Sequence, residues 1–215
     1  MIELHIKEIG GIMPTSKNTL WEIAEEAYES SPAPAVDKWG LLQPYSAGIK
    51  CYKNGNNIIV GIRGTADMRD IKADLQIVYS GITKSSRYKS DLSILKQIQE
   101  KYKPPLFKYY SVSHSLGSAI ADELIHNGYI QEGVSYNGAV DLLKFKNGGR
   151  NHRIYNEDDI LYNLMGRFTT NPEVRKNKIS FTQRALNLIP LGKLGNSVKA
   201  HLLSNFKGGF HVILS

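Results

Sequence analysis

The chain has 215 residues, of which 41% are hydrophobic and 22% charged, and it contains a single cysteine. This length provides for one sizeable core and is short for two linked domains, so we expect one domain over residues 1–215. The lone Cys51 excludes an internal disulfide and a thiolate metal cluster, and the composition excludes extensive disorder.

The formal net charge is +7, and the positive charge gathers between residues 166 and 200. A solvated face is the ordinary meaning of such a bias, and transient contact with an anionic membrane or lipid surface is the alternative; no nucleic-acid partner is expected. The first thirty residues are rich in glutamate and lack the apolar core of a signal peptide, and no stretch is long enough to span a membrane. We therefore expect a soluble protein as synthesised.

The first half of the chain predicts a helix and a hairpin. Residues 19–28 show helical spacing of apolar side chains after the candidate caps Thr15, Ser16 and Asn18. After a proline-rich passage, the alternating residues 48–53 predict a strand in which Cys51 is a small buried side chain. Asn54-Gly55 favours a type I′ turn into a partner strand at residues 57–63.

Further along, helices and strands alternate. Residues 91–102 and 116–126 have helical periodicity, and the second of these helices ends at Asn127-Gly128. The apolar run at residues 106–112 and the short runs at 133–136 and 153–156 predict strands. Such alternation predicts an α/β fold, with a mostly parallel sheet flanked by helices on both faces and ligand sites beyond the carboxyl ends of the strands.

The segment Ser113-His114-Ser115-Leu116-Gly117 joins a predicted strand directly to a predicted helix. A sharp turn of this kind needs small residues two positions on either side of its centre, and Ser113 and Gly117 meet that need. Taken alone the pattern is weak, because a serine before a helix is more often an N-cap. Asp159 and His201 follow in the order Ser, Asp, His that this fold uses for a catalytic triad.

Four segments carry a resemblance to a known family: Ile62-Arg63-Gly64-Thr65, Ser113 to Gly117, Tyr155-Asn156-Glu157-Asp158-Asp159-Ile160-Leu161, and His201-Leu202-Leu203-Ser204-Asn205-Phe206. With them the chain resembles the class 3 lipases, the fungal triacylglycerol lipase family, in a compact form. The resemblance implies an α/β-hydrolase fold and cleavage of lipid carboxylic esters through an acyl-enzyme, with no cofactor and no metal. It implies these roles: nucleophile Ser115, general base His201, orienting acid Asp159, and oxyanion hole Thr65 with Leu116.

The chain departs from the family in three places. Ser113 and Ser118 stand where the elbow has glycines, and both are small enough to be tolerated. The counterpart of the lid, residues 66–75, keeps few apolar side chains, which argues against strong interfacial activation. Residues 186–194 are rich in leucine and could supply a groove for an acyl chain.

Alternatives remain open for both the site and the function. Asp158 or Asp141 could replace Asp159, although Asp141 reads better as an N-cap, and His211 could replace His201, although a histidine in an apolar run is usually packed in the core. The same machinery would also serve a thioesterase or an amidase. A non-catalytic basic module that binds anionic lipid or nucleic acid is the remaining alternative. The oligomeric state is open.

Overall fold

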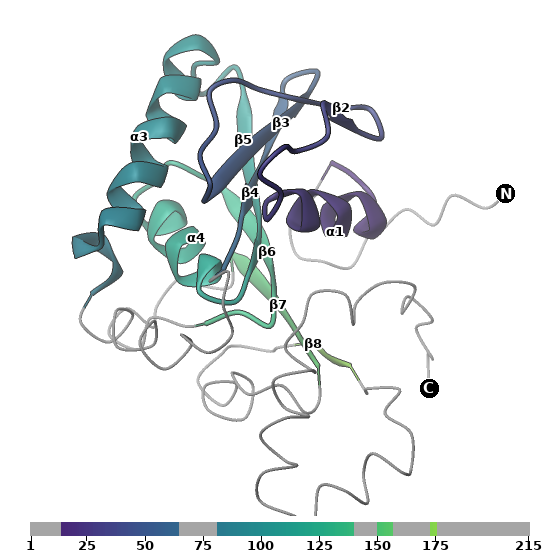
Figure 1. The fold of residues 1–215 in the computed structure, drawn as a ribbon, viewed down its shortest axis with the longest axis vertical. Helices are drawn as coiled ribbons and strands as arrows, with labels where there is room; N and C mark the ends of the chain where they lie inside the picture. The colour runs from purple at the N-terminus through teal and green to yellow at the C-terminus, as the bar shows by residue number, and fades with distance from the viewer. Residues whose placement is uncertain (1–13, 65–80, 140–149, 157–172, 176–215) are drawn as a thin grey trace, which may run out of the picture.

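The computed structural model describes residues 14–64, 81–139, 150–156 and 173–175, and these form an 8-stranded sheet with helices on both faces (Figure 1). The strands pair antiparallel from the first to the fourth and parallel from the fourth to the eighth. In chain order, which is also their order across the sheet, they are β1 (Ala35–Val36), β2 (Trp39–Leu41), β3 (Ile49–Asn54), β4 (Asn57–Ile62), β5 (Lys108–His114), β6 (Glu132–Tyr136), β7 (Asn151–Asn156) and β8 (Glu173–Arg175).

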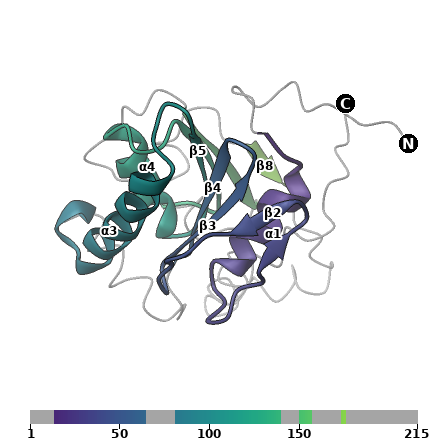
Figure 2. The ribbon, with the colours of Figure 1, turned by 90° about the horizontal axis from the view of Figure 1, so that it is seen from above.

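Helix α1 (Lys17–Glu26) covers one face of the sheet, and α3 (Ser86–Lys101) and α4 (Gly117–His126) cover the other (Figure 2). The start of α1 matches the predicted cap, since Ser16 Oγ accepts a hydrogen bond of 3.1 Å from the Thr19 N–H. A 3-10 turn, η2 (Ile82–Lys84), leads into α3. The expected α/β class, with a sheet that has helices on both faces, is confirmed for the described residues.

Two apolar cores lie on opposite faces of the sheet, because successive side chains of a strand point to opposite sides. Ile59 and Val112 belong to the core under α1, whereas Val60 belongs to the core under α3 and α4. Cys51 lies in the second core and is fully buried, as expected, and burial raises the pKa of its thiol to about 12. Its thiolate is therefore scarce at neutral pH, which speaks against a role as nucleophile.

The hairpin between β3 and β4 differs from the sequence prediction. Asn54 pairs with Asn57, so the two turn residues are Gly55 and Asn56 rather than Asn54 and Gly55. Gly55 has a positive φ of 55°, whereas the φ of Asn56 is not positive. A single positive φ at the first turn position is typical of a type II′ turn, so the type I′ prediction is wrong. The shift places glycine at the position that needs the left-handed backbone.

The parallel register brings the carboxyl ends of the central strands to a common edge. Ile62 of β4 pairs with Ser113 of β5, His114 with Tyr136 of β6, and Tyr136 with Ile154 of β7. The residues that follow these strands therefore meet at one edge, which is where the sequence places the candidate site.

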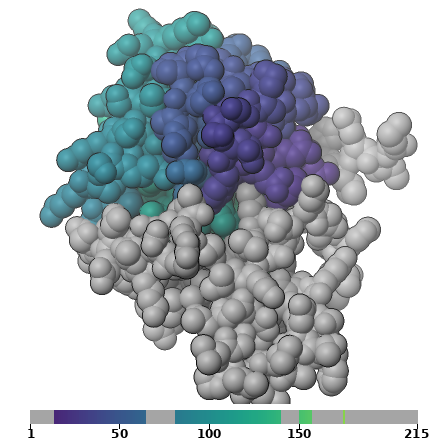
Figure 3. All heavy atoms as spheres, viewed as in Figure 1, coloured from purple at the N-terminus to yellow at the C-terminus, as the bar shows by residue number. Residues whose placement is uncertain are grey.

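Away from that edge, α3 contacts the antiparallel part of the sheet. The space-filling view shows α3 beside the β2–β3 region on one face of the molecule (Figure 3). In the ranges that the structure describes, no helix is long and apolar enough to cross a membrane. The lid counterpart at residues 66–75 and the leucine-rich residues 186–194 lie outside those ranges, and the single domain over the whole chain stays a prediction.

Candidate active site

The candidate site is built around the turn between β5 and α4, which contains only Ser115 and Leu116. Ser115 has a φ of 55°, a left-handed conformation that is uncommon for a residue other than glycine. Leu116 is already right-handed helical, with φ −56° and ψ −31°. The sharp bend expected from the sequence is thus observed, and strain of this kind persists only where the surrounding structure enforces it.

Backbone hydrogen bonds hold Ser115 in this conformation. Its N–H donates to the Tyr136 carbonyl at 3.2 Å, and its own carbonyl accepts from the Ser118 and Ala139 N–H groups at 3.0 Å each. The bend is therefore fixed both by α4 and by the loop that follows β6. Ser115 is only 4% exposed, and exclusion of water strengthens the effect of any hydrogen-bond donor that faces its hydroxyl.

The end of β4 approaches this turn so closely that only glycines fit. A Cβ atom on Gly117 would lie 2.4 Å from the Ile62 carbonyl oxygen, and one on Gly64 would lie 2.6 Å from the Ser115 Cβ. Gly64 is followed by Thr65, the predicted oxyanion-hole residue, which lies outside the described residues. Among the described residues, the N–H of Leu116, the other predicted oxyanion-hole residue, donates to no backbone acceptor.

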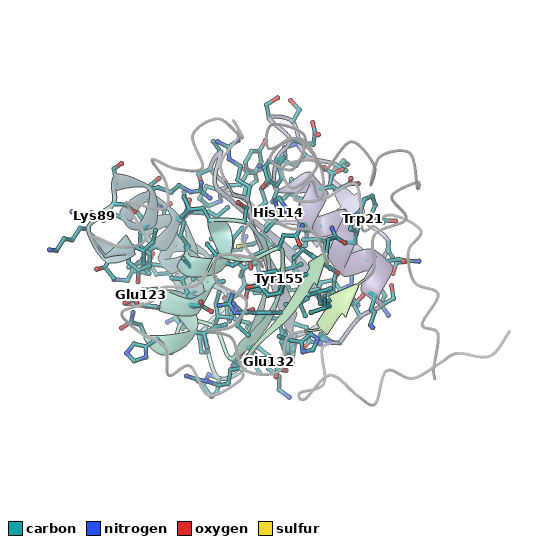
Figure 4. The ribbon with its side chains drawn as sticks, turned by 90° about the horizontal axis from the view of Figure 1, so that it is seen from below. Trp21, Lys89, His114, Glu123, Glu132 and Tyr155 are labelled. Atoms are coloured by element: carbon teal, nitrogen blue, oxygen red, sulfur yellow. The ribbon has the colours of Figure 1, made fainter. Side chains whose placement is uncertain are left out.

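Tyr28, just after the end of α1, connects the end of β5 with the residues that follow β4. Its Oη lies 2.6 Å from His114 Nδ1 and accepts a hydrogen bond of 2.9 Å from the Gly64 N–H. Burial raises the pKa of Tyr28 to about 12, so the phenol stays protonated at neutral pH. The protonated phenol can therefore donate to His114 Nδ1 while it accepts from Gly64. His114 lies on the α1 side of the sheet (Figure 4).

An ion pair from α3 fixes the last residue before Gly64. Arg87 donates from Nη2 to the carbonyls of Gly48 and Arg63, at 2.9 Å each, and from Nε to Asp91 at 2.5 Å. Asp91 is 1% exposed, and desolvation raises the pKa of its carboxyl, an effect that Arg87 opposes. A Cβ on Gly48 would lie 2.2 Å from Arg87 Nε, so the glycine makes this approach possible. The pair thereby orients the segment that leads to Thr65.

The loop after β6 is clamped by β7. Asn137, with a φ of 44°, donates from its N–H to the Ile154 carbonyl at 2.8 Å and accepts at Oδ1 from the Asn156 N–H at 2.9 Å. Tyr155 donates from its hydroxyl to the Gly138 carbonyl at 2.7 Å. The loop that binds the Ser115 carbonyl is thus held by the strand that precedes the predicted acid.

Several predicted site residues lie outside the described residues: Thr65, Asp159 and His201, with the alternatives Asp158, Asp141 and His211. Asp159 is the third residue after Asn156, where β7 ends at the same sheet edge as β5. The structure brings Ser115, Leu116 and Gly64 together. The triad as a whole stays a prediction.

Sequence reasoning missed three residues that support the site: Tyr28, Arg87 and Asp91. The Arg87–Asp91 pair carries a local signal, because residues four apart lie on one face of a helix. Asp91 also occupies a core-facing position of α3, which is unusual for a carboxylate. Tyr28 has no such local signal, since its partner His114 is 86 residues away in the chain.

No protein-family model matches the chain, and no curated protein matches its sequence. Solved structures similar in fold include a fungal lipase–inhibitor complex, with 13% identity, a TM-score of 0.48, and coverage of 75% of this chain and 79% of that chain. Two others are the Lip2 lipase of Yarrowia lipolytica, with 15% identity and a TM-score of 0.46, and a mutant form of MDLA from Penicillium cyclopium, with 17% identity and a TM-score of 0.46. Each of these two matches covers 75% of this chain and 78% of the other. At such identities the similarity concerns the fold and assigns no role to any residue.

Proposed function

We propose that this protein is a serine hydrolase that cleaves carboxylic esters of lipids, with Ser115 as nucleophile, His201 as general base and Asp159 as the acid that orients it. The observation that supports the proposal best is the left-handed backbone of Ser115 between a buried strand and a helix. A turn of this kind directs a serine hydroxyl above the sheet in α/β-hydrolases. An N-cap serine, the ordinary alternative, has an extended backbone, as Ser16 and Ser85 do here.

In the proposed reaction, His201 takes the proton of Ser115 Oγ as the oxygen attacks the ester carbonyl carbon. The new O–C bond forms a tetrahedral oxyanion that accepts hydrogen bonds from the Leu116 N–H and from Thr65. Collapse breaks the ester C–O bond, and the alcohol leaves with the proton from His201. Water then attacks the acyl-enzyme by the same route, releases the acid and restores the Ser115 hydroxyl.

The proposal also specifies that the ester substrate is a lipid. It is supported by the four class 3 lipase motifs, by the leucine-rich residues 186–194, which could hold an acyl chain, and by the basic residues 166–200, which suit anionic head groups. Hydrolysis of nitrophenyl esters of increasing chain length, below and above their solubility limit, would separate a lipase from a simple esterase. Equal turnover of neutral and anionic lipid esters would remove the case for head-group selection.

A single substitution tests the catalytic assignment. We expect Ser115→Ala to lower the turnover of a short-chain nitrophenyl ester at least about a thousandfold and to abolish labelling by a fluorophosphonate. Ser111→Ala is the matched control, because Ser111 is a buried serine of β5, the strand that leads to Ser115, and its hydroxyl has no hydrogen-bond partner among the described residues. Undiminished turnover by Ser115→Ala would contradict the proposal.

The two alternatives give different results in the same assays. A thioesterase or amidase would be labelled by the fluorophosphonate but would prefer thioester or amide substrates, because a triad does not choose its leaving group. A non-catalytic basic module would bind anionic lipid vesicles with strong salt dependence and would not be labelled.

A further inference from the structure

The contact between α4 and strands β5 to β7 is polar, although it is buried. Parallel strands covered on both faces normally carry apolar side chains there. In this chain the strands place four polar side chains against α4, and α4 contributes two polar side chains to the same contact. All six residues are at most 8% exposed: Ser113, Ser135, Asn151 and Arg153 from the strands, and Ser118 and Asp122 from the helix.

These six side chains form one continuous series of hydrogen bonds, which we call the polar circuit. Ser113 Oγ lies 3.2 Å from Ser118 Oγ and 2.8 Å from Ser135 Oγ. Ser135 donates to Asn151 Oδ1 at 2.8 Å, and Asn151 Nδ2 donates to Asp122 at 2.7 Å. The other oxygen of Asp122 accepts from Arg153 Nη2 in a buried ion pair.

Both ends of the polar circuit lead to the candidate nucleophile. At one end, the Ser118 N–H donates to the Ser115 carbonyl at 3.0 Å. At the other end, Arg153 Nη1 donates to the Ala139 carbonyl at 3.2 Å, and the Ala139 N–H donates to the same Ser115 carbonyl at 3.0 Å. The circuit therefore connects to the Ser115 carbonyl at both ends and ties the strained turn to β7, the strand that precedes the predicted acid.

A gain in the free energy of unfolding does not explain why these polar side chains are buried. Burying polar groups is costly unless they are paired, and apolar side chains of similar volume often stabilise a core as well or better. What a fully paired network provides is a single arrangement, because any shift leaves a buried donor or acceptor without its partner. Such a network suits a turn whose backbone must be held in an unfavourable conformation.

The polar circuit also accounts for two departures of the sequence from the lipase elbow. Ser113 and Ser118 stand where the family has glycines, and their hydroxyls are neighbours in the circuit. Gly138 makes room for two members of the circuit, Ser118 and Arg153, because a Cβ there would lie 2.6 Å from Ser118 Oγ and 2.8 Å from Arg153 Nη1. Small size alone would have been served by glycine or alanine, so the hydroxyls themselves have a use.

We propose that the residues of the polar circuit are positioning residues, which hold the backbone of Ser115 in its reactive conformation through the Ser118 and Ala139 amides. The inference rests on the proposed function in so far as the reactivity of Ser115 is concerned. It adds a positioning role for six side chains that touch no reacting atom.

The test compares two alanine substitutions on one face of β5. Ser113→Ala removes a member of the circuit, whereas Ser111→Ala removes a buried hydroxyl that has no partner among the described residues. We expect Ser113→Ala to react with a fluorophosphonate about tenfold more slowly than Ser111→Ala when both are folded, because a small displacement of a reacting atom has large effects on rate. Ser118→Ala breaks the circuit from the helix side and serves if Ser113→Ala does not fold.

A second readout does not depend on catalysis. Amide hydrogen exchange of Ser115 and Ala139, followed by NMR, should be faster in Ser113→Ala than in Ser111→Ala, since the Ser115 N–H belongs to the turn and the Ala139 N–H donates to the Ser115 carbonyl. If the wild-type protein neither reacts with the fluorophosphonate nor cleaves esters, the proposed function fails and exchange alone decides the positioning role. Equal exchange at Ser115 and Ala139 in the two variants, or equal labelling rates in an active enzyme, would overturn the inference.

Discussion

Gly64→Ala is the substitution whose effect follows most directly from distances in the site. The added Cβ would lie 2.6 Å from the Ser115 Cβ, 2.8 Å from the His114 carbonyl oxygen and 2.9 Å from Tyr28 Oη. Ordinary contacts begin at 3.4 Å, so the loop after β4 and the turn at Ser115 must separate by roughly 0.8 Å, the difference between 3.4 and 2.6 Å. Overpacking of this kind costs about 1–3 kcal/mol of folding free energy.

The catalytic effect of Gly64→Ala should exceed its effect on stability. A displacement approaching 1 Å near the reacting atom lowers the rate about a hundredfold, and loss of an oxyanion donor has a similar effect. Gly40→Ala is the control, because the nearest atom to its Cβ would be the Lys53 carbonyl oxygen at 4.0 Å. Ester turnover per folded molecule and unfolding in urea measure the two effects. A folded Gly64→Ala protein that cleaves esters as fast as Gly40→Ala would refute the reasoning.

Three further predictions concern buried polar groups. Tyr28→Phe leaves the Gly64 N–H without its acceptor, and we expect a loss of about 1–3 kcal/mol in urea unfolding together with slower turnover. Asp122→Ala should cost about 3–5 kcal/mol, because it leaves Arg153 buried without its carboxylate, and Asp122→Leu combined with Arg153→Met should recover most of that stability. Burial lowers the pKa of Lys50 from 10.5 to about 8, so the folded protein binds fewer protons than the unfolded chain between these values and its stability should rise with pH there, a contribution that Lys50→Met removes.

Each of these predictions has a clear contrary outcome. Unchanged unfolding of Tyr28→Phe would mean that water replaces the phenol at no cost. A double variant at Asp122 and Arg153 that is no more stable than Asp122→Ala would contradict the account of a stranded charge. For Lys50, the quantity to compare is the difference in unfolding free energy between wild type and Lys50→Met at pH 7.5 and pH 10. A difference that does not move in favour of the wild type with rising pH would contradict the lowered pKa.

The parts of the fold that sequence reasoning found are those specified within a few neighbouring residues. The turn at Ser115 needs a strand, small residues and a helix in direct succession, and all are visible in the sequence. The hairpin was found as well, but its turn type was missed because one residue of register decides which position takes the positive φ. The short strands β1, β2 and β8 were not predicted, since two or three residues carry no periodicity.

The connections that stabilise the site depend on distant pairings. The link from Ser135 to Asn151 requires the register of β6 against β7, and each residue alone resembles an ordinary turn or surface residue. Likewise, the sequence pattern predicts only that Tyr28 is the last residue of an amphipathic helix. Only the placement of α1 against the end of β5 turns it into a partner of His114.

The two outermost strands of the described sheet, β1 and β8, have only 2 and 3 residues, whereas the strands that carry the site have 5 to 7. A brief outer strand offers few open backbone groups to a neighbouring molecule, which guards against edge-to-edge aggregation. The longer strands are bonded to neighbours on both sides and are harder to peel away. Crowded or partly denaturing conditions should therefore fray β1 and β8 before they disturb the turn at Ser115.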